Sequence, residues 1–293
     1  MNRYLTSCHR ARGRQAGTLP APPGARTPRS RRVLRRAVAA AAVASALLLP
    51  TTAGAVPHRG PATAAAPAQL APERAPSPVE HLFGSDNRRI PTDEKVVALT
   101  FNAAWNDAGL DTILAELRRR RVPATFFLTG DFADRHPEAA RAMAAEHGIG
   151  NHSYNHPQFA ELSSQEMTDE VMRADDAIRR ATGAEPLPFF RFPYSETTEQ
   201  GIAHVNALGF ADIEFTADTN GYLGAAGGMT VDRAVARAVD ALAPGEIVQM
   251  HVGASDGQGP VLDAEALPRI IDAVQERGYR IVDLRTLLAA DTV

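Results

Sequence analysis

The sequence predicts an α/β fold in which helices cover a parallel β-sheet. From residue 95 to residue 283, apolar runs of strand length alternate with longer amphipathic segments, which is typical of parallel strands joined by helical connections. Polar residues also gather directly after several of the apolar runs. Together the two observations predict an open sheet or a (β/α) barrel with one pocket at the carboxyl ends of its strands.

The expected strands are short apolar runs, of which Val-Val-Ala-Leu-Thr-Phe is the first and Ala-Thr-Phe-Phe-Leu the second. Runs of this length and composition are typical of strands buried in a sheet. About seven strands are expected, at residues 95–101, 124–128, 148–150, 189–192, 210–215, 246–250 and 280–283.

The expected helices follow from apolar residues at helical spacing. Leu110, Ile113, Leu114 and Leu117 form one such face, and Pro123 ends that helix. A serine and a glutamate three residues apart form a capping box before a longer helix further along the chain. Later helices are expected from Pro137, from Ser163 to Gly183, through Ile202 and Val205, from Val231 to Leu242, and from Pro268.

Polar residues lie at or just after the carboxyl ends of five of these strands. In a parallel sheet those ends meet at one edge, where ligands collect. Unrelated surface residues would not all select the same end of successive strands, so we expect one pocket. Its residues are Asn102, His152, His156, Arg191, Asp218 and His251.

His152 and His156 are the first candidates for a metal site. A helical turn between them would place both imidazoles on one face, close enough to share an ion, and neutral imidazole is a common ligand for zinc. For the pair alone, two exposed loop histidines would be the preferred explanation. The polar residues at the other strand ends favour the metal site.

Five short motifs of the chain resemble, in order, those of the polysaccharide deacetylase family, carbohydrate esterase family four. The resemblance covers roughly residues 92 to 288, and the motifs are specific as a set, although each alone is weak. They are Thr-Phe-Asn-Ala from Thr100, where the family has T-F-D-D, the stretch from His152 to His156, Arg-Phe-Pro-Tyr from Arg191, Asp-Thr-Asn-Gly-Tyr from Asp218, and Ile-Val-Gln-Met-His from Ile247.

The resemblance implies a distorted (β/α) barrel that hydrolyses N-acetyl groups on glucosamine-containing glycans. It implies that His152 and His156 hold a divalent ion, usually zinc, together with an aspartate of the first motif. In the same scheme the other aspartate of that motif is the general base and His251 is the general acid. Arg191 would position groups of the first motif, and the backbone N–H of Tyr194 would bind the oxyanion.

The first motif departs from the family pattern. Asn102 stands in place of the base and Ala103 in place of the metal-binding aspartate. An amide does not accept a proton as a carboxylate does, and alanine has no ligand atom. Asn102 is therefore expected to contact substrate, and the family's usual mechanism cannot run unaltered.

Two other carboxylates could compensate. Asp107 could reach the ion as third ligand or the water as base, or it could cap the following helix; both roles remain open. Asp218 could orient His251, act as base, or cap a loop. We prefer the first role because Gly221 occupies the place of the family's aspartate that tunes the catalytic histidine.

Trp105 is the only tryptophan and follows the first motif. Its ring could stack on the apolar C–H face of a sugar, or it could be a lid that shields the pocket. Trp105 and Tyr194 are therefore expected to bind substrate beside Asn102.

The amino-terminal residues predict export. Arginine pairs precede an apolar run from Ala37 to Leu49 and an Ala-Gly-Ala site, so residues 1–55 are expected to be a secretory signal, read by the Sec or the twin-arginine route. The apolar run is too short for a comfortable membrane span, and translation could start downstream of residue 1. Residues 56–78, rich in Ala and Pro, are expected to be a disordered linker, and residues 79–293 the deacetylase-like domain.

Charge and cysteine usage limit the possible functions. Residues 1–55 hold ten of the 31 basic residues and no acidic residue, so the remainder has 21 basic against 34 acidic residues and a net charge of −13. This acidity argues against nucleic acid as a partner. The only cysteine, Cys8, lies in the signal, so the exported protein would have neither a disulfide nor a thiol nucleophile.

Three hypotheses of function follow. The leading one is a secreted or wall-associated deacetylase of peptidoglycan or a chitin-like glycan, with a divalent metal as cofactor. The alternative is a wall-glycan-binding protein that keeps the pocket without the chemistry. A hydrolase of another amide or ester is a third reading. The sequence does not specify the glycan, the metal or the oligomeric state.

Overall fold

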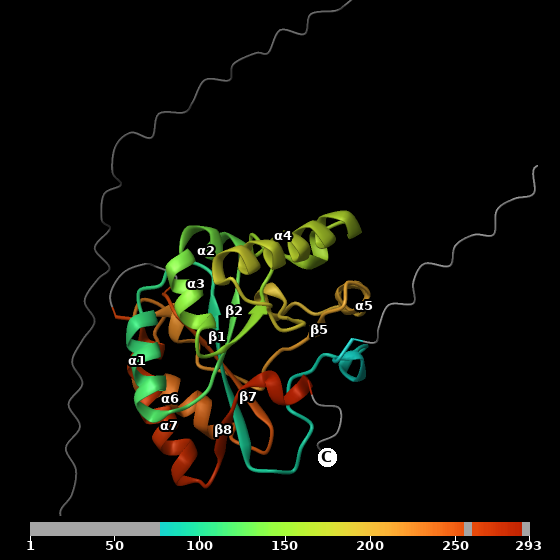
Figure 1. Cartoon of the computed structure of the whole chain (residues 1–293). Coiled ribbons are helices and arrows are strands. Elements are labelled where there is room, and N and C mark those ends of the chain that lie inside the picture. The colour runs from blue at the N-terminus through green and yellow to red at the C-terminus, as the bar shows by residue number, and fades with distance from the viewer. Residues whose placement is uncertain (1–76, 255–259, 289–293) are drawn as a thin grey trace, which may run out of the picture. The chain divides into compact units, whose positions relative to one another are not determined.

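The structure, a computed structural model, describes residues 77–254 and 260–288 and confirms a barrel-like α/β fold (Figure 1). The expected signal and linker lie outside these residues, apart from Ser77 and Pro78 at the linker's end. In the described part of the chain, no helix is both long and apolar enough to cross a membrane. The strands are β1 (Val96–Ala103), β2 (Thr125–Leu128), β3 (Gly148–Asn151), β4 (Phe189–Phe190), β5 (Ala211–Asp212), β6 (Ala217–Asp218), β7 (Glu246–His251) and β8 (Arg280–Val282).

The strands form one parallel sheet in the order β5-β4-β3-β2-β1-β7-β6. β7 pairs along one edge of β1, so β8 and β2 share the other edge, β8 at the first residues of β1 and β2 at the last. β5 pairs with β4 and β6 pairs with β7, and only residues 213–216 separate β5 from β6. This short connection links the two outer strands, so the sheet curls into a distorted (β/α) barrel.

The same connection explains why the structure has eight strands rather than about seven. The sequence predicts one strand at residues 210–215. In the structure β5 lies within this stretch and pairs with β4, whereas β6 follows the stretch and pairs with β7, so the chain changes partner between them. A change of partner is invisible in apolar periodicity, which reports burial and not pairing.

The helices are α1 (Leu110–Arg120), α2 (Gly130–Arg135), α3 (Pro137–Ala144), α4 (Ser164–Thr182), α5 (Glu199–Ala207), α6 (Val231–Asp240) and α7 (Leu262–Glu276). The predicted capping box forms at the start of α4, and Gly183 ends that helix in the left-handed conformation. The sequence missed α2, which is six residues long. It also placed the start of α7 too late, because Pro268 lies inside that helix.

Alternation along β1 separates the barrel core from the core beneath the helices. Val97, Leu99, Phe101 and Ala103 belong to the cluster that α1 and α7 cover. The intervening positions face the barrel interior, where Ala98 joins an apolar cluster with Phe127 and Ile247. Further along the same face come Thr100 and Asn102, which are buried polar residues. The interior is therefore apolar near the amino ends of the strands and polar near their carboxyl ends, where the site lies.

Candidate functional site

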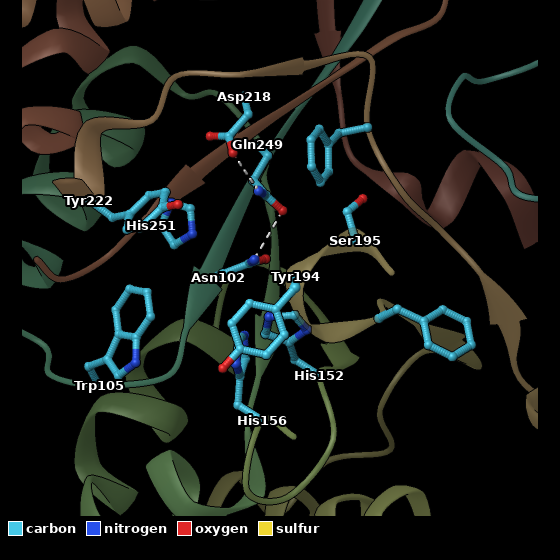
Figure 2. Close-up of a pocket in the computed structure, with 12 residues that line it drawn as sticks. Asn102, Trp105, His152, His156, Tyr194, Ser195, Asp218, Tyr222, Gln249 and His251 are labelled. Atoms are coloured by element: carbon cyan, nitrogen blue, oxygen red, sulfur yellow. Dashed lines mark hydrogen bonds between the residues drawn. The ribbon is translucent and has the colours of Figure 1, made fainter. Parts of the chain in front are cut away.

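A pocket lies at the carboxyl ends of the strands, where the sequence predicts it (Figure 2). It encloses about 500 Å³ when the space open to solvent is included. Its lining residues are Asn102, Trp105, His152, His156, Phe192, Tyr194, Ser195, Phe215, Asp218, Tyr222, Gln249 and His251.

A loop after β3, and not a helical turn, brings His152 and His156 together. Ser153 and His156 both have positive φ angles, 65° and 60°, which few residues with side chains adopt. Glu170, on α4, fixes the loop because its carboxylate accepts the backbone N–H groups of Tyr154 and Asn155 at 2.9 and 2.7 Å. The two imidazole centroids are 4.8 Å apart, with the rings nearly perpendicular.

The tautomer of His152 follows from its partner. Nδ1 lies 2.8 Å from the carbonyl oxygen of Arg191, and a carbonyl can only accept, so Nδ1 carries the proton and Nε2 keeps a lone pair. Burial lowers the pKa of His152 well below its ordinary value, and burial lowers the pKa of His156 to about 4. Both rings are therefore neutral at physiological pH.

A directed chain of hydrogen bonds crosses the floor of the pocket (Figure 2). Arg191 donates to Oδ1 of Asn102 at 3.1 Å, and Nδ2 of Asn102 donates to Oε1 of Gln249 at 3.0 Å. Nε2 of Gln249 in turn donates to Oδ2 of Asp218 at 3.0 Å. Both ends of the Asn102 amide are therefore engaged, which fixes its orientation.

Arg191 is fully buried below this floor. Its guanidinium also donates to Oγ1 of Thr100 and to the carbonyl of Ile213, each at 3.0 Å. Burial lowers the pKa of Arg191 to about 10, and the nearby Glu214 partly offsets that effect, so Arg191 is charged at neutral pH. Burial also raises the pKa of Glu214, whose carboxylate accepts the hydroxyl of Ser195 in the pocket wall.

Asp107 does not occupy either place that the sequence left open. Its carboxylate lies 3.2 Å from Nδ1 of His136, and the N-cap of α1 is Gly109, without a side-chain cap. Among the described residues, no group of three His, Cys, Asp or Glu side chains could hold an ion. The third ligand expected from Asp107 is therefore not in place, because a histidine from the end of α2 competes for that carboxylate.

The sequence favours a role for Asp218 in orienting His251. In the structure Asp218 lies in the pocket but does not contact His251. Oδ2 accepts from Gln249 and Oδ1 accepts from the backbone N–H of Asn220 at 2.8 Å. Both oxygens thus have partners other than the histidine. The carboxylate caps its own loop and ends the chain of amides.

Aromatic rings form one wall of the pocket. Trp105 lies nearly parallel to His251, at 5.9 Å between centroids and 13° between planes, and 5.6 Å from Tyr222. Tyr194 packs edge-on against His156 at 4.6 Å. Trp105 is 37% exposed and Tyr194 60% exposed. Exposed aromatic faces beside polar groups are suited to a ring with both apolar and hydroxylated surfaces.

The residues present fit only part of the metal site that the family resemblance implies. His152 and His156 are neutral nitrogen donors, and the hydrogen bond that fixes the His152 tautomer is typical of histidine ligands. A catalytic zinc site needs three protein ligands. Asn102 uses its amide in the floor and Ala103 faces the helix-covered core, so neither completes the set.

Three residues that the sequence did not single out shape this site. They are Glu170, which holds the histidine loop, Gln249, which links Asn102 to Asp218, and Asp263, which accepts the backbone N–H of His251 at 2.8 Å. A polar residue inside an apolar buried strand was a signal for Gln249. Nothing local in the sequence pointed to the other two.

Comparisons with known proteins agree with the geometry. The family model described as polysaccharide deacetylase matches residues 89–213. A chitooligosaccharide deacetylase of Bradyrhizobium sp. (strain ANU 289) is 34% identical over 200 residues, which cover 65% of this chain and 90% of that protein. A peptidoglycan-N-acetylglucosamine deacetylase of Bacillus cereus is 29% identical over 199 residues, covering 67% and 70% of the two chains.

A solved structure adds a further similarity. BA3943 from Bacillus anthracis, described as a pseudoenzyme of carbohydrate esterase family four, superposes with a TM-score of 0.63 at 28% identity, covering 70% of this chain and 69% of that one. A mutant of the same protein, described as having restored enzymatic activity, superposes with a TM-score of 0.62, also at 28% identity, covering 70% and 72%.

Proposed function

Because this chain belongs to the polysaccharide deacetylase family, carbohydrate esterase family four, we propose that its pocket binds the N-acetylated amino sugars of a glycan, such as peptidoglycan or a chitin-like oligomer, without hydrolysing them. The observation that carries the proposal is the floor of the pocket. Asn102 and Gln249 form a satisfied amide chain where the family resemblance implies a carboxylate base. Asp218 is the one carboxylate among the described lining residues, and both its oxygens are engaged.

The aromatic wall supports glycan binding. Trp105 and Tyr194 are exposed, and Tyr222 is in ring contact with both Trp105 and His251. Rings that are held in place present apolar area to a sugar with little loss of side-chain entropy. The loop that carries Trp105 is itself fixed, because Arg135 donates to the Trp105 carbonyl at 3.1 Å.

The histidines supply hydrogen-bond acceptors beside these rings. With Nδ1 of His152 donating to a backbone carbonyl, Nε2 can accept from a sugar hydroxyl or from the N–H of an acetamido group. Burial keeps His152 and His156 neutral at physiological pH. The Ser195 hydroxyl donates to Glu214, so its oxygen can accept from substrate as well.

Metal-dependent hydrolysis of the N-acetyl groups is the second candidate. It is favoured by the paired neutral imidazoles of His152 and His156 with His251 in the same pocket. It requires a third ligand and a base that the described residues do not supply as they stand. The two candidates therefore predict opposite responses to zinc.

The experiment is calorimetric titration of the purified full-length chain with N-acetylglucosamine oligomers, with EDTA and then with zinc, together with an assay for acetate. We expect binding in EDTA and no acetate with zinc. Trp105→Ala should weaken binding by about tenfold. A nucleic-acid base that stacks on an aromatic side chain gains about 1–3 kcal/mol, and we expect a gain of this order for a sugar ring on Trp105. Met172→Ala is the matched control, because Met172 is 38% exposed, close to the 37% of Trp105, but lies on α4 away from the pocket lining.

His251→Ala separates the candidates further. Binding should survive this change if the pocket only recognises the glycan, whereas acetate release would be lost if His251 is the general acid. Acetate release by the unmutated chain, dependent on zinc and on His251, would overturn the binding proposal in favour of hydrolysis. Absence of binding and of release would overturn both candidates.

We also propose that the protein acts outside the cytoplasm at the wall, where such glycans occur. The proposal depends on the signal expected at residues 1–55. Cell fractionation of the full chain and of a chain lacking residues 1–55 tests it. Equal cytoplasmic retention of the two would contradict it.

A further inference from the structure

Asp263 is a buried carboxylate without a full set of partners. It lies in the first turn of α7 and is 0% exposed. Oδ2 accepts the backbone N–H of His251 at 2.8 Å, and Oδ1 has no hydrogen-bond partner. A buried charge is costly unless it is compensated. The helix dipole at the start of α7 provides part of that compensation, and a nearby donor would provide more.

The nearest side-chain donor is the ring of His251. Nδ1 of His251 is buried and has no hydrogen-bond partner either, and it lies 3.8 Å from Oδ2 of Asp263. The ring contacts both Trp105 and Tyr222, at centroid distances of 5.9 and 4.5 Å. A small rotation within this stack would close the gap to hydrogen-bond length.

Gly221 makes room for this carboxylate. A Cβ at position 221 would lie 2.1 Å from Oδ1 of Asp263 and 2.4 Å from its Cγ, far inside contact distance. A side chain at 221 and the carboxyl group at 263 would therefore occupy the same space. Asp218 does not take this place, because its oxygens bind Gln249 and Asn220.

We propose that Asp263 is the positioning residue for His251, and that its carboxylate occupies from α7 the space that the missing side chain of Gly221 leaves open. Asp263 accepts from Nδ1–H, so the neutral ring keeps the lone pair on Nε2, where it can accept from a ligand. The inference goes beyond the proposed function and does not depend on it, since the tautomer exists whether the pocket binds, hydrolyses or does neither.

The test is the tautomer of His251 in the full-length chain, measured by NMR with ¹⁵N-labelled histidine and assigned by comparison with His251→Ala. The unmutated chain should show mainly the Nδ1–H form. Asp263→Ala removes the oxygen that faces Nδ1, so the Nδ1–H form should no longer predominate. Loss of the correct tautomer when the aspartate of a serine-protease triad is replaced is a known parallel. Asp218→Asn is the matched control and should leave the tautomer unchanged.

A second pair of variants keeps the inference testable if Asp263→Ala alone does not fold. Gly221→Asp alone should lower the melting temperature because of the clash with Asp263. Combined with Asp263→Ala, the same substitution should fold better than Gly221→Asp alone and restore the Nδ1–H form. The inference is overturned if the tautomer is the same in the unmutated chain and in Asp263→Ala, or if the double variant shows mainly Nε2–H. Failure of glycan binding alone would bear only on the proposed function.

Discussion

The two halves of the pocket use their polar groups in opposite ways. In the histidine half, formed by His152 and His156, the rings are neutral and Nε2 of His152 remains available to a ligand. In the amide half, formed by Asn102, Gln249 and Asp218, the side chains hydrogen-bond one another in a chain. The histidine half can therefore accept hydrogen bonds from a ligand, whereas the polar groups of the amide half are already paired with one another.

The difference shows how the altered first motif is accommodated. With an amide at position 102, Arg191 donates to a neutral oxygen, and the nearby Glu214, Asp212 and Asp218 favour its charged form. The Asn102 amide then needs an acceptor, which Gln249 supplies. The floor is therefore a consistent hydrogen-bonded unit around the substituted residue.

Arg191 joins the two halves, and its replacement should have the largest effect. Its carbonyl fixes His152 and its guanidinium holds Asn102. Arg191→Met should lower the free energy of unfolding by about 3–5 kcal/mol, because it leaves buried acceptors and acidic groups without their cation. Urea denaturation measures this. Arg119→Met, which removes an exposed arginine paired with Glu116, should leave stability nearly unchanged, and equal effects of the two substitutions would contradict the assignment.

Restoring both carboxylates of the first motif should supply metal ligands in addition to the histidines. Asn102→Asp with Ala103→Asp should raise zinc affinity by about 100-fold, since an added ligand contributes at least as much as the outer-shell groups worth 10–100-fold. Without zinc the variant should be less stable than the unmutated chain, because Ala103 is buried among apolar groups, and zinc should recover part of the loss.

Calorimetry and thermal unfolding with and without zinc measure these two effects. The same double substitution in a His152→Ala background is the control and should lose the gain in affinity. Unchanged zinc affinity in the restored chain would show that residue 103, on the helix-facing side of β1, cannot reach the histidines.

Stability should depend on pH through the histidine half. The pKa of folded His156 is lowered to about 4 from an ordinary value of 6.5. As the pH falls through this window, the unfolded chain takes up a proton that the folded chain excludes, so stability falls. His156→Gln should reduce the loss of unfolding free energy between pH 6.5 and 4 by about 1–2 kcal/mol. This is less than the full pKa shift implies, because the loop can relax. Denaturation across this pH range measures it. Gln249→Met should leave the pH slope unchanged, and an equal slope in unmutated and His156→Gln chains would contradict the prediction.

Much of the fold follows from the sequence because apolar periodicity and helix caps are local signals. The runs that became β1, β2 and β7 are continuous and apolar, and the capping box of α4 is a four-residue pattern. Strand pairing is not local. The additional strand β6, which follows the strand expected at residues 210–215, is defined by its pairing with β7, and the periodicity of neither segment shows that pairing.

The site divides in the same way. The polar residues at the strand ends do meet in one place, because the parallel order of the strands brings them there. Their partners could not be read from spacing: His136 holds Asp107, Glu170 holds the histidine loop, and Asp263 holds His251. Each comes from a different helix or helix end, and only the packed structure brings them close. The loop conformations of this pocket could therefore not be predicted from the sequence.

The amide chain itself should yield the smallest effect and the sharpest internal test. Gln249→Leu leaves Nδ2 of Asn102 and Oδ2 of Asp218 without their partner, and should lower the free energy of unfolding by about 1–2 kcal/mol. Adding Asn102→Leu and Asp218→Leu would leave Arg191 without the Asn102 acceptor and without the nearby charge of Asp218. The informative second change is therefore Asp218→Asn alone, which keeps the shape of the side chain and removes its charge. If the hydrogen-bonded side chains act as a cooperative unit, Asp218→Asn should lower the free energy of unfolding less in the Gln249→Leu variant than in the unmutated protein. The reason is that the hydrogen bond it weakens is already absent in that variant. A double-mutant cycle by urea denaturation measures the difference. Strict additivity would mean that the amide half is a set of independent contacts, and that Asn102 could return to aspartate without regard to Gln249.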